Sequence, residues 1–423
     1  MKNNIINIGK SFLAKIIAFV GFYLCDIILA RGLCVDEYAE WTYFFSVVSI
    51  VLWISNFGIS LTIRTIVARE ECAENRKYYT NCGIILRFIV SAFFSAIFFV
   101  FSNSIAVLSG WPEQYPDLLL LIRAGCVLPL FMAFVELWKD IFIGTGRLSS
   151  LVEMAVFEHI GYAVGCLIGI LICKNVRGAL MGYYVGYITA TFVGSFITKI
   201  SFKNFVLSEK TKEDIVNIFK SAMPYVVTCV ITFVILEMDT VMIGMFRVGN
   251  SELANYSVAK KMIQKAVNVN EAFLYVVLPR FASVKRGENA GIYTTFKRIQ
   301  NINILITATV AIGIAVVLTK LVPIIYGVEY AQTKRFLIAL LPVYFCNGIL
   351  QCYMQFLYYR AKAHIVSACY ASSFVINLIM NWVLIPKLGA MGAAIGTITS
   401  LIPFVIALVL FTFHEWKLIN VTN

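Results

Sequence analysis

Five polar or charged residues lie at helical spacing within a stretch that is otherwise apolar enough to cross a membrane. They are Lys261, Gln264, Lys265, Asn268 and Glu271, and a helix places all of them on one polar face. At 1.5 Å per residue this face is about 15 Å long, roughly half of the hydrocarbon core. An ionisable group at the centre of a bilayer costs about 2.5–3.5 kcal/mol on insertion scales, so the polar face is expected to avoid lipid. It could line a water-filled cavity and bind an anion, or form a static salt-bridged contact between helices.

Acidic residues lie at a similar depth in two other apolar stretches. Asp26 and Asp239 each precede the external end of such a stretch by a few residues, and Glu237 is beside Asp239. Lys260 and the lysines of the polar face enter the membrane from that same side. Together with Glu271, these acids could form a gate with the lysines, or bind protons or sodium ions and couple a conformational cycle to a gradient. Permanent pairing between helices explains the same residues equally well.

Further candidates are basic or carry amides. Arg31 and Arg64 stand at the ends of predicted spans, where a long basic side chain usually extends to the interface, and each is also a candidate ligand for an anionic substrate. Asn347 and Gln351 belong to one amide-lined helical face, and Asn377 belongs to a second. Such faces suit sugar hydroxyls, but hydrogen bonding between helices explains them as well.

Cysteine and histidine give no sign of a metal site or a cofactor. The 11 cysteines are scattered along apolar stretches without a C-x-x-C pair, and the 3 histidines lie far apart. Cysteines in such places are typically small apolar packing residues. The sequence therefore predicts no bound metal, no cofactor and no disulfide framework.

The elements that must position these residues are membrane-spanning helices. Of the 423 residues, 60% are hydrophobic and 14% are charged, whereas soluble domains carry about 25% charged residues. The mean hydropathy is +0.83. A span needs roughly 20 mostly apolar residues, and on that criterion the sequence predicts an all-α polytopic membrane protein with about 12 spans. These are 11–30, 41–63, 81–101, 117–138, 150–173, 178–198, 221–246, 256–279, 301–320, 335–358, 365–386 and 390–413.

The net charge of +12 reflects topology rather than a nucleic-acid partner. Lysine and arginine are concentrated in the loops on one side of the predicted spans, including 64–77 and 199–220. Such loops are cytoplasmic by the positive-inside rule. Both termini are therefore expected in the cytoplasm, and nucleic acid is not an expected partner.

An internal repeat divides the chain into two similar halves. The run 181–190, MGYYVGYITA, recurs almost half the chain further on as 391–400, MGAAIGTITS, and Asp26 and Asp239 are close to equivalent in it. We expect an N-terminal six-helix lobe at 1–205 and a C-terminal six-helix lobe at 206–423. With six spans each, the lobes would be related by a pseudo-two-fold axis along the membrane normal, with the pathway between them.

Several motifs follow one another in the order of a known family. They are ILARGL at 28–33, DEY at 36–38, FGIS at 57–60, MDTVMIG at 238–244, AKK at 259–261, LPR at 278–280, IYGVEY at 325–330, NLIMN at 377–381 and IPKLGAMGAA at 385–394. In this order the chain resembles Wzx-type polysaccharide and O-antigen flippases, the oligosaccharidyl-lipid branch of the multidrug/oligosaccharidyl-lipid/polysaccharide exporter superfamily.

The resemblance implies a function and a place for it. Such flippases move undecaprenyl-diphosphate-linked oligosaccharides, such as O-antigen or capsule repeat units, across the bacterial cytoplasmic (inner) membrane by alternating access. In the similar lipid II flippases, basic residues of the first, second and eighth spans meet the diphosphate, and Lys260 or Lys261 falls at one such position. Cys25 stands where that branch has another arginine, which is a departure from the pattern. A polysaccharide polymerase and chain-length machinery are implied partners, besides membrane lipid.

Two other functions remain open from the sequence. A multidrug extruder of the same superfamily would favour an acidic, aromatic cavity for cationic drugs, and the lysines weigh against it. A polytopic polysaccharide polymerase would ordinarily need a sizeable external loop, and the predicted external loops are short. We therefore predict a transporter rather than an enzyme.

Overall fold

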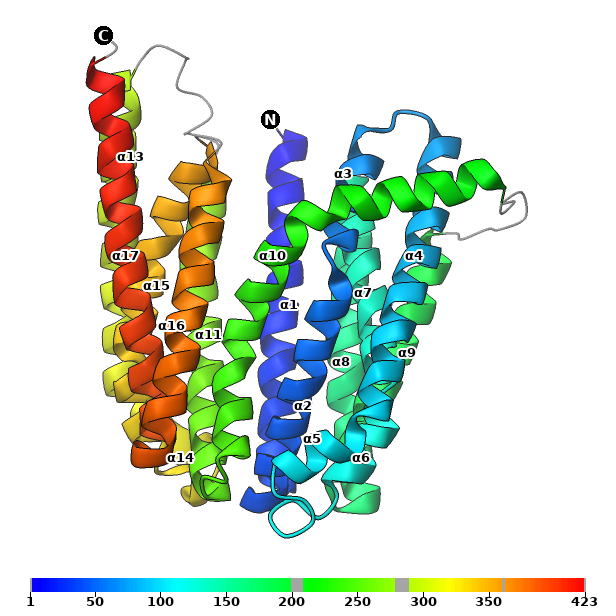
Figure 1. Ribbon diagram of the computed structural model, residues 1–423, viewed down its shortest axis with the longest axis vertical. Coiled ribbons are helices and arrows are strands. Elements are labelled where there is room, and N and C mark those ends of the chain that lie inside the picture. The colour runs from blue at the N-terminus through cyan, green and yellow to red at the C-terminus, as the bar shows by residue number, and fades with distance from the viewer. Residues whose placement is uncertain (1, 199–207, 278–288, 360–361, 422–423) are drawn as a thin grey trace. The chain divides into compact units, whose positions relative to one another are not determined.

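The computed structural model describes residues 2–198, 208–277, 289–359 and 362–421, and every regular element in these ranges is a helix (Figure 1). The helices are α1 (Lys2–Gly32), α2 (Val35–Asn56), α3 (Ile59–Arg69), α4 (Ala73–Val100), α5 (Ser102–Leu108), α6 (Leu118–Gly125), α7 (Leu128–Gly144), α8 (Leu148–Cys173), α9 (Val176–Thr198), α10 (Glu209–Met245), α11 (Asn250–Val277), α13 (Asn289–Gly313), α14 (Thr319–Ile325), α15 (Thr333–Tyr359), α16 (Ala363–Leu388) and α17 (Ala390–Val421). A π-helical turn, Ile314–Leu318, joins α13 to α14, and a 3-10 turn, Val328–Tyr330, precedes α15.

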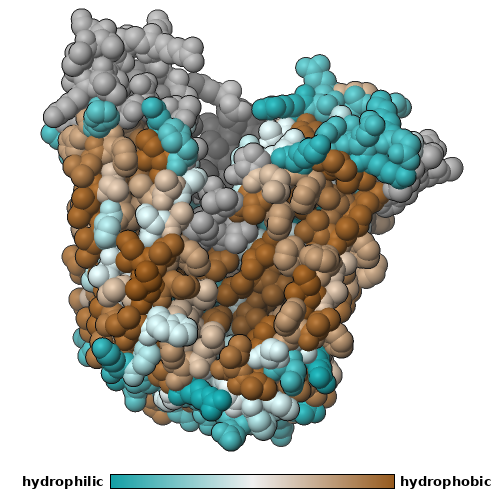
Figure 2. Space-filling view, in the orientation of Figure 1, coloured by the Kyte–Doolittle hydropathy of each residue, from teal (hydrophilic) through white to brown (hydrophobic). Residues whose placement is uncertain are grey.

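The helices coincide with the expected spans. By length and composition, 8 helices among the described residues can cross a membrane, or up to 9 if the bent pair α6 and α7 is one span. α1, α10 and α11 overlap the other three expected spans, and α11 is polar because it carries the lysines of the polar face. Along the middle of the helices the exposed side chains of each unit are mostly hydrophobic, and those at the helix ends are hydrophilic (Figure 2), as a bilayer requires.

Helix packing divides the chain into two units, Met1–Glu237 and Met238–Asn423. The interior of the first unit includes Trp41 and Trp138, both 1% exposed, and that of the second includes Tyr256 and Tyr344. Each unit therefore has a core of its own. The lobe boundary expected at 205/206 lies outside the described residues and stays a prediction.

Glycines of the repeat allow one pair of helices in each unit to pack very closely. In the first unit, a Cβ added at Gly165 of α8 or Gly182 of α9 would collide with the backbone of the other helix. In the second unit, a Cβ at Gly392 of α17 would collide with the backbone of Leu384 in α16. Small residues at such contacts let helices associate where lipid removes the hydrophobic driving force. Gly182 and Gly392 are equivalent residues of the repeat, which therefore preserves a close helix pair in each half.

α10 begins well before the seventh expected span. It is already helical from Glu209, where the sequence analysis places a hydrophilic connection. Its first part packs within the first unit: the Tyr78 hydroxyl of α4 donates to Asp214 at 2.8 Å, and the ring of Phe57 stacks on Phe219 with centroids 5.7 Å apart. This long helix bends along its course (Figure 1). Its polar first turns are thus held by side-chain contacts to α4 and to the residues between α2 and α3.

Candidate functional site

The polar face of the eighth span lies on an uninterrupted helix. α11 runs from Asn250 to Val277, so residues at the predicted spacing share one side of it. Lys261, Gln264, Lys265, Asn268 and Glu271 are all half-buried. At the far end of the face, Gln351 of α15 donates from its Nε2 to Glu271 Oε1 at 3.3 Å. Two separately predicted candidates, Glu271 and Gln351, are therefore brought together.

Lys260 does not belong to the polar face, and its side chain contacts α10. It is 8% exposed, and its ammonium group donates a hydrogen bond to Thr240 Oγ1 of α10 at 2.5 Å. Thr240 follows Asp239 directly in the chain. A buried lysine needs hydrogen-bond partners because an isolated charge is costly in an apolar interior. Lys260 thus belongs to the contact between α10 and α11 that also holds Asp239.

Asp239 sits in a network of hydrogen-bond donors from three other helices of the second unit. Asn381 Nδ2 of α16 donates to its Oδ1 at 2.7 Å, while Tyr256 OH of α11 and Thr397 Oγ1 of α17 lie 2.8 and 2.7 Å from its Oδ2. Asn377 Nδ2 contacts Thr397 Oγ1 at 3.3 Å, and its own Oδ1 accepts from Asn381 at 3.1 Å. Asp239 thus accepts from one amide and two hydroxyl groups, and the network also contains amide and hydroxyl oxygens of the kind that hard cations bind.

One oxygen of this network meets no hydrogen-bond donor among the described residues. Asn381 is fully buried, and its Oδ1 accepts no hydrogen bond from any described residue. A buried acceptor left without a donor costs about 1–3 kcal/mol. Together with the ionisable Asp239, this acceptor marks a place that a small cation or a water molecule would complete.

Asp26 occupies the equivalent position in the first unit, with different surroundings. It is 3% exposed and accepts a hydrogen bond from Tyr38 OH of α2 at 2.9 Å. The thiol of its neighbour Cys25 contacts the Tyr183 hydroxyl at 3.8 Å. Tyr183 in turn stacks on Tyr162, with ring centroids 5.1 Å apart and an interplanar angle of 6°. These aromatic rings therefore pack beside Cys25, the residue before Asp26.

The remaining candidates lie in separate places. Glu237 is half-buried and accepts from Ser46 OH at 2.8 Å. Arg31 is exposed at the end of α1. Asn347 is half-buried and donates to the Val343 carbonyl of its own helix at 3.0 Å. Asn377, by contrast, is fully buried within the Asp239 network.

The first unit contains a cluster of ion pairs that the sequence analysis did not predict. Lys139 lies 2.9 Å from Glu136 and 2.8 Å from Glu158 of α8, and Arg64 of α3 lies 3.2 Å from Asp140. The fourth span is predicted to end at 138, but α7 continues to Gly144. The longer helix places residues 136, 139 and 140 at i, i+3 and i+4 on one inward face. That spacing was visible in the sequence, but only if the span was allowed to continue.

Arg87 stabilises a break in the second span, and it too was missed. α2 and α3 are separated by Phe57 and Gly58, with φ values of 48° and 69° in the left-handed region, where a residue with a Cβ is uncommon. The Arg87 side chain is fully buried and donates to the Ser55 carbonyl at 2.6 Å and to the Ala133 carbonyl at 3.4 Å. A cation at a helix C-terminus favourably meets carbonyls that lack helical partners. An arginine within the third expected span was the available signal.

Comparison with known proteins decides the family. A family model described as "Polysaccharide biosynthesis protein" matches residues 1–285, which is more than half of the chain. The chain belongs to the polysaccharide biosynthesis protein family. It is also 22% identical over 424 residues to a Salmonella typhimurium protein named "Putative O-antigen transporter", covering 94% of this chain and 93% of that protein.

Solved structures with the same fold are transporters. This family member is similar to the lipid II flippase MurJ in an inward closed conformation, with a TM-score of 0.74, 14% identity and coverage of 99% of this chain and 90% of that one. It is also similar to a multidrug resistance MATE family transporter of the MOP superfamily, with a TM-score of 0.73, 13% identity and coverage of 98% and 99%.

The family and the fold confirm several predictions. The protein is an all-α, multi-pass membrane protein with the two-lobe helical fold of the MOP superfamily. The family and its structural neighbours are transporters and flippases, which agrees with the prediction of a transporter. The roles of individual residues are not decided by these comparisons and stay predictions.

Proposed function

We propose that this protein moves an undecaprenyl-diphosphate-linked oligosaccharide from the cytoplasmic to the external leaflet by alternating access. The observation that carries the proposal is the half-buried cationic and amide face of α11 in a member of the polysaccharide biosynthesis family. A diphosphate with attached sugars cannot cross hydrocarbon unaided, because removing such groups from water is very costly. Lysines and amides within a span replace that hydration while the polyprenyl tail stays in lipid.

Most of the basic and amide candidates have a proposed part in substrate binding. Lys261 and Lys265 bind the diphosphate, and Gln264 and Asn268, one helical turn apart, meet the sugars. Gln351 contributes through its hydrogen bond to Glu271, and Lys260, Arg31, Arg64 and Asn347 remain candidate ligands. Full burial of Asn377 favours a place in the Asp239 network over direct contact with sugar.

The polar face is tested by removing its charges one at a time. Lys261→Ala and Lys265→Ala should each slow flipping of a fluorescent lipid-linked oligosaccharide in reconstituted vesicles by about tenfold or more, since a charge-assisted hydrogen bond contributes about 1.5–3 kcal/mol. Lys261→Arg should retain more activity than Lys261→Gln. Lys77→Ala, which alters an exposed lysine at the start of α4, is the control. Wild-type rates in both alanine variants would contradict the proposal.

We further propose that Asp239, Asn381 and Thr397 bind the ion that couples transport to a gradient. The Asp239 carboxylate, the Thr397 hydroxyl beside it and the Asn381 Oδ1, which meets no donor among the described residues, favour sodium over a proton, because oxygen ligands suit a hard cation. Glu237, Glu271 and Asp26 are the other acids proposed for gating or coupling. Flipping should rise with a sodium gradient at fixed pH. Dependence on a pH gradient alone would assign the coupling to protons.

The orientation proposed is that of a bacterial cytoplasmic-membrane protein with both termini in the cytoplasm. In a variant without reactive native cysteines, Glu113→Cys should react with an impermeant reagent in intact cells, and Lys210→Cys should react only after permeabilisation. The opposite pattern would reverse the topology. A polymerase and chain-length proteins remain predicted partners.

A further inference from the structure

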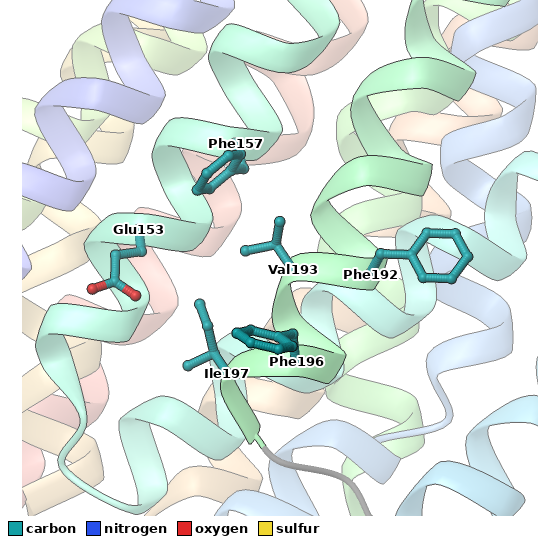
Figure 3. A pocket seen from close by; sticks show the side chains of 6 residues that line it. All are labelled: Glu153, Phe157, Phe192, Val193, Phe196 and Ile197. Atoms are coloured by element: carbon teal, nitrogen blue, oxygen red, sulfur yellow. The ribbon is translucent and has the colours of Figure 1, made fainter.

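A groove lies on the surface of the first unit between α8 and α9. It has a volume of about 680 Å³ and is lined by Glu153, Phe157, Phe192, Val193, Phe196 and Ile197. Figure 3 shows Glu153 and Phe157 on one helix and the other four on the next, with the Phe192 ring pointing outward from the shared space. Phe192 is 70% exposed and Phe196 is 85% exposed. In a membrane protein, such rings meet lipid.

The groove arises from a change of side-chain size along one ridge of α8. Gly169, Gly165 and Gly161 recur every four residues and lie against the backbone of α9. The next two residues of the same ridge are Phe157 and Glu153. Residues four apart lie along one side of a helix. This side of α8 therefore carries glycines toward its C-terminal end, where α9 packs closely, and larger side chains toward its N-terminal end. The two helices cannot approach there as they do at the glycines, and the groove opens.

An acid lines the groove, and a base lies next to it. Glu153 is exposed and has no hydrogen bond or ion pair to any described residue. Arg147, at the start of α8, is exposed and donates from its guanidinium to the carbonyl of the groove residue Ile197 at 3.5 Å. α8 starts and α9 ends at this level, where the helices leave the membrane. The mostly apolar groove, with a carboxylate in its lining and a guanidinium beside it, therefore lies near the ends of two predicted spans, where lipid headgroups are expected.

We propose that this groove binds a zwitterionic aminophospholipid of the phosphatidylethanolamine type. Its ammonium group pairs with Glu153, its phosphate pairs with Arg147, and an acyl chain lies along Phe157 and Phe196. Charge complementarity selects this ligand: Glu153 repels a lipid whose headgroup is only anionic, and a primary ammonium can donate hydrogen bonds to a carboxylate, whereas a trimethylated one cannot. With the predicted topology, the lipid belongs to the cytoplasmic leaflet.

The lipid site is tested with the full-length protein in detergent and three defined lipids. Retention of phosphatidylethanolamine, phosphatidylglycerol and phosphatidylcholine is measured by native mass spectrometry for the native protein, Glu153→Gln and Arg147→Gln. Phosphatidylethanolamine should be the preferred lipid, and each variant should bind it about tenfold more weakly, as expected for one charge-assisted hydrogen bond. Glu153→Gln should gain affinity for phosphatidylglycerol. Glu113→Gln, which removes an exposed carboxylate outside the groove, should bind like the native protein.

Three outcomes would overturn the proposal. The first is unchanged phosphatidylethanolamine binding in both groove variants. The second is equal or tighter retention of phosphatidylglycerol or phosphatidylcholine by the native protein. The third is capture of a protein in place of lipid when a photoreactive amino acid replaces Phe196, because that result would make the groove a protein interface. The replaced side chains are exposed, so the variants are expected to fold and to give one of these answers.

Discussion

Each half of the chain has a buried aspartate at a near-equivalent position of the repeat, Asp26 in α1 and Asp239 in α10, but the two aspartates have different surroundings. In each half, a tyrosine of a neighbouring helix donates to it: Tyr38 to Asp26 at 2.9 Å, and Tyr256 to Asp239 at 2.8 Å. Beyond this shared pair the surroundings diverge. In the first half the aromatic pair Tyr162 and Tyr183 packs against Cys25, the residue before Asp26, whereas in the second half amide and hydroxyl groups converge on Asp239 itself.

The repeat explains how this divergence arose from small changes. By its alignment, Tyr183 and Tyr187 of α9 correspond to Ala393 and Thr397 of α17. Two large rings in the first half are thus replaced by a methyl group and a short hydroxyl in the second. With the smaller residues in place, an amide and a hydroxyl group meet the carboxylate. A duplicated helix pair therefore serves aromatic packing in one half and holds the proposed ion site in the other.

The largest effect is expected from neutralising the second aspartate. Asp239→Asn should weaken sodium stimulation of flipping by about 100-fold, or roughly 2.7 kcal/mol, because it removes the only formal charge proposed to meet the ion. Asp26→Asn should leave the sodium concentration for half-maximal stimulation nearly unchanged. Flipping assays over a sodium titration measure both. Equal losses in the two variants would mean that the halves do not differ in the proposed way.

The close helix pairs should be equally sensitive in both halves. Gly182→Ala and Gly392→Ala should each destabilise the protein by about 1–3 kcal/mol, because the added Cβ collides with backbone that cannot move alone. Thermal unfolding in detergent measures the loss. Gly313→Ala is the control, since nothing lies within 4 Å of a Cβ at that position. Tolerance at only one of the repeat glycines would show that the two pairs pack differently.

A smaller effect on sodium stimulation is expected from removing the Thr397 hydroxyl. Thr397→Val keeps the shape but removes the oxygen near Asp239, and should weaken sodium stimulation by about tenfold. Tyr187→Phe, at the equivalent position of the first half, should leave it unchanged. Both variants are measured by the same sodium titration. A response to the tyrosine change would implicate the aromatic side of Asp26 in coupling.

The smallest effect, on stability, is expected from removing the tyrosine-to-aspartate hydrogen bond that both halves contain. Tyr38→Phe and Tyr256→Phe each remove one hydroxyl from a buried carboxylate and should cost about 1 kcal/mol of stability. The melting temperatures of the two variants should fall by similar amounts. A loss in one half alone would indicate that the paired Tyr–Asp contact is structural in only that half.

Most of the fold and part of the site could be predicted from local pattern. The polar face of α11 followed from helical spacing, and the division into two similar halves was predicted from the repeat, whereas the close helix pairs at its glycines were found only in the structure. The ion pairs of Lys139 and Asp140 were missed because hydropathy falls where they begin, and the fourth span was ended there. Phe57 and Gly58 were noted only as a motif, since a helix break held by a distant arginine has no local signature.

What the sequence determined by itself is which side chains share a helical face and how deep they lie. Both depend on the periodicity and length of an apolar stretch, and these are local quantities. Only the tertiary structure decided the partners of Asp239, because Asn381 and Thr397 are 142 and 158 residues away in the chain. Whether these residues meet depends on where the helices cross. The crossing point depends on small residues that allow close contact, here Gly392 of α17 against the backbone of Leu384 in α16. Many arrangements of the helices would give these polar side chains hydrogen-bond partners, and helix packing selects one arrangement.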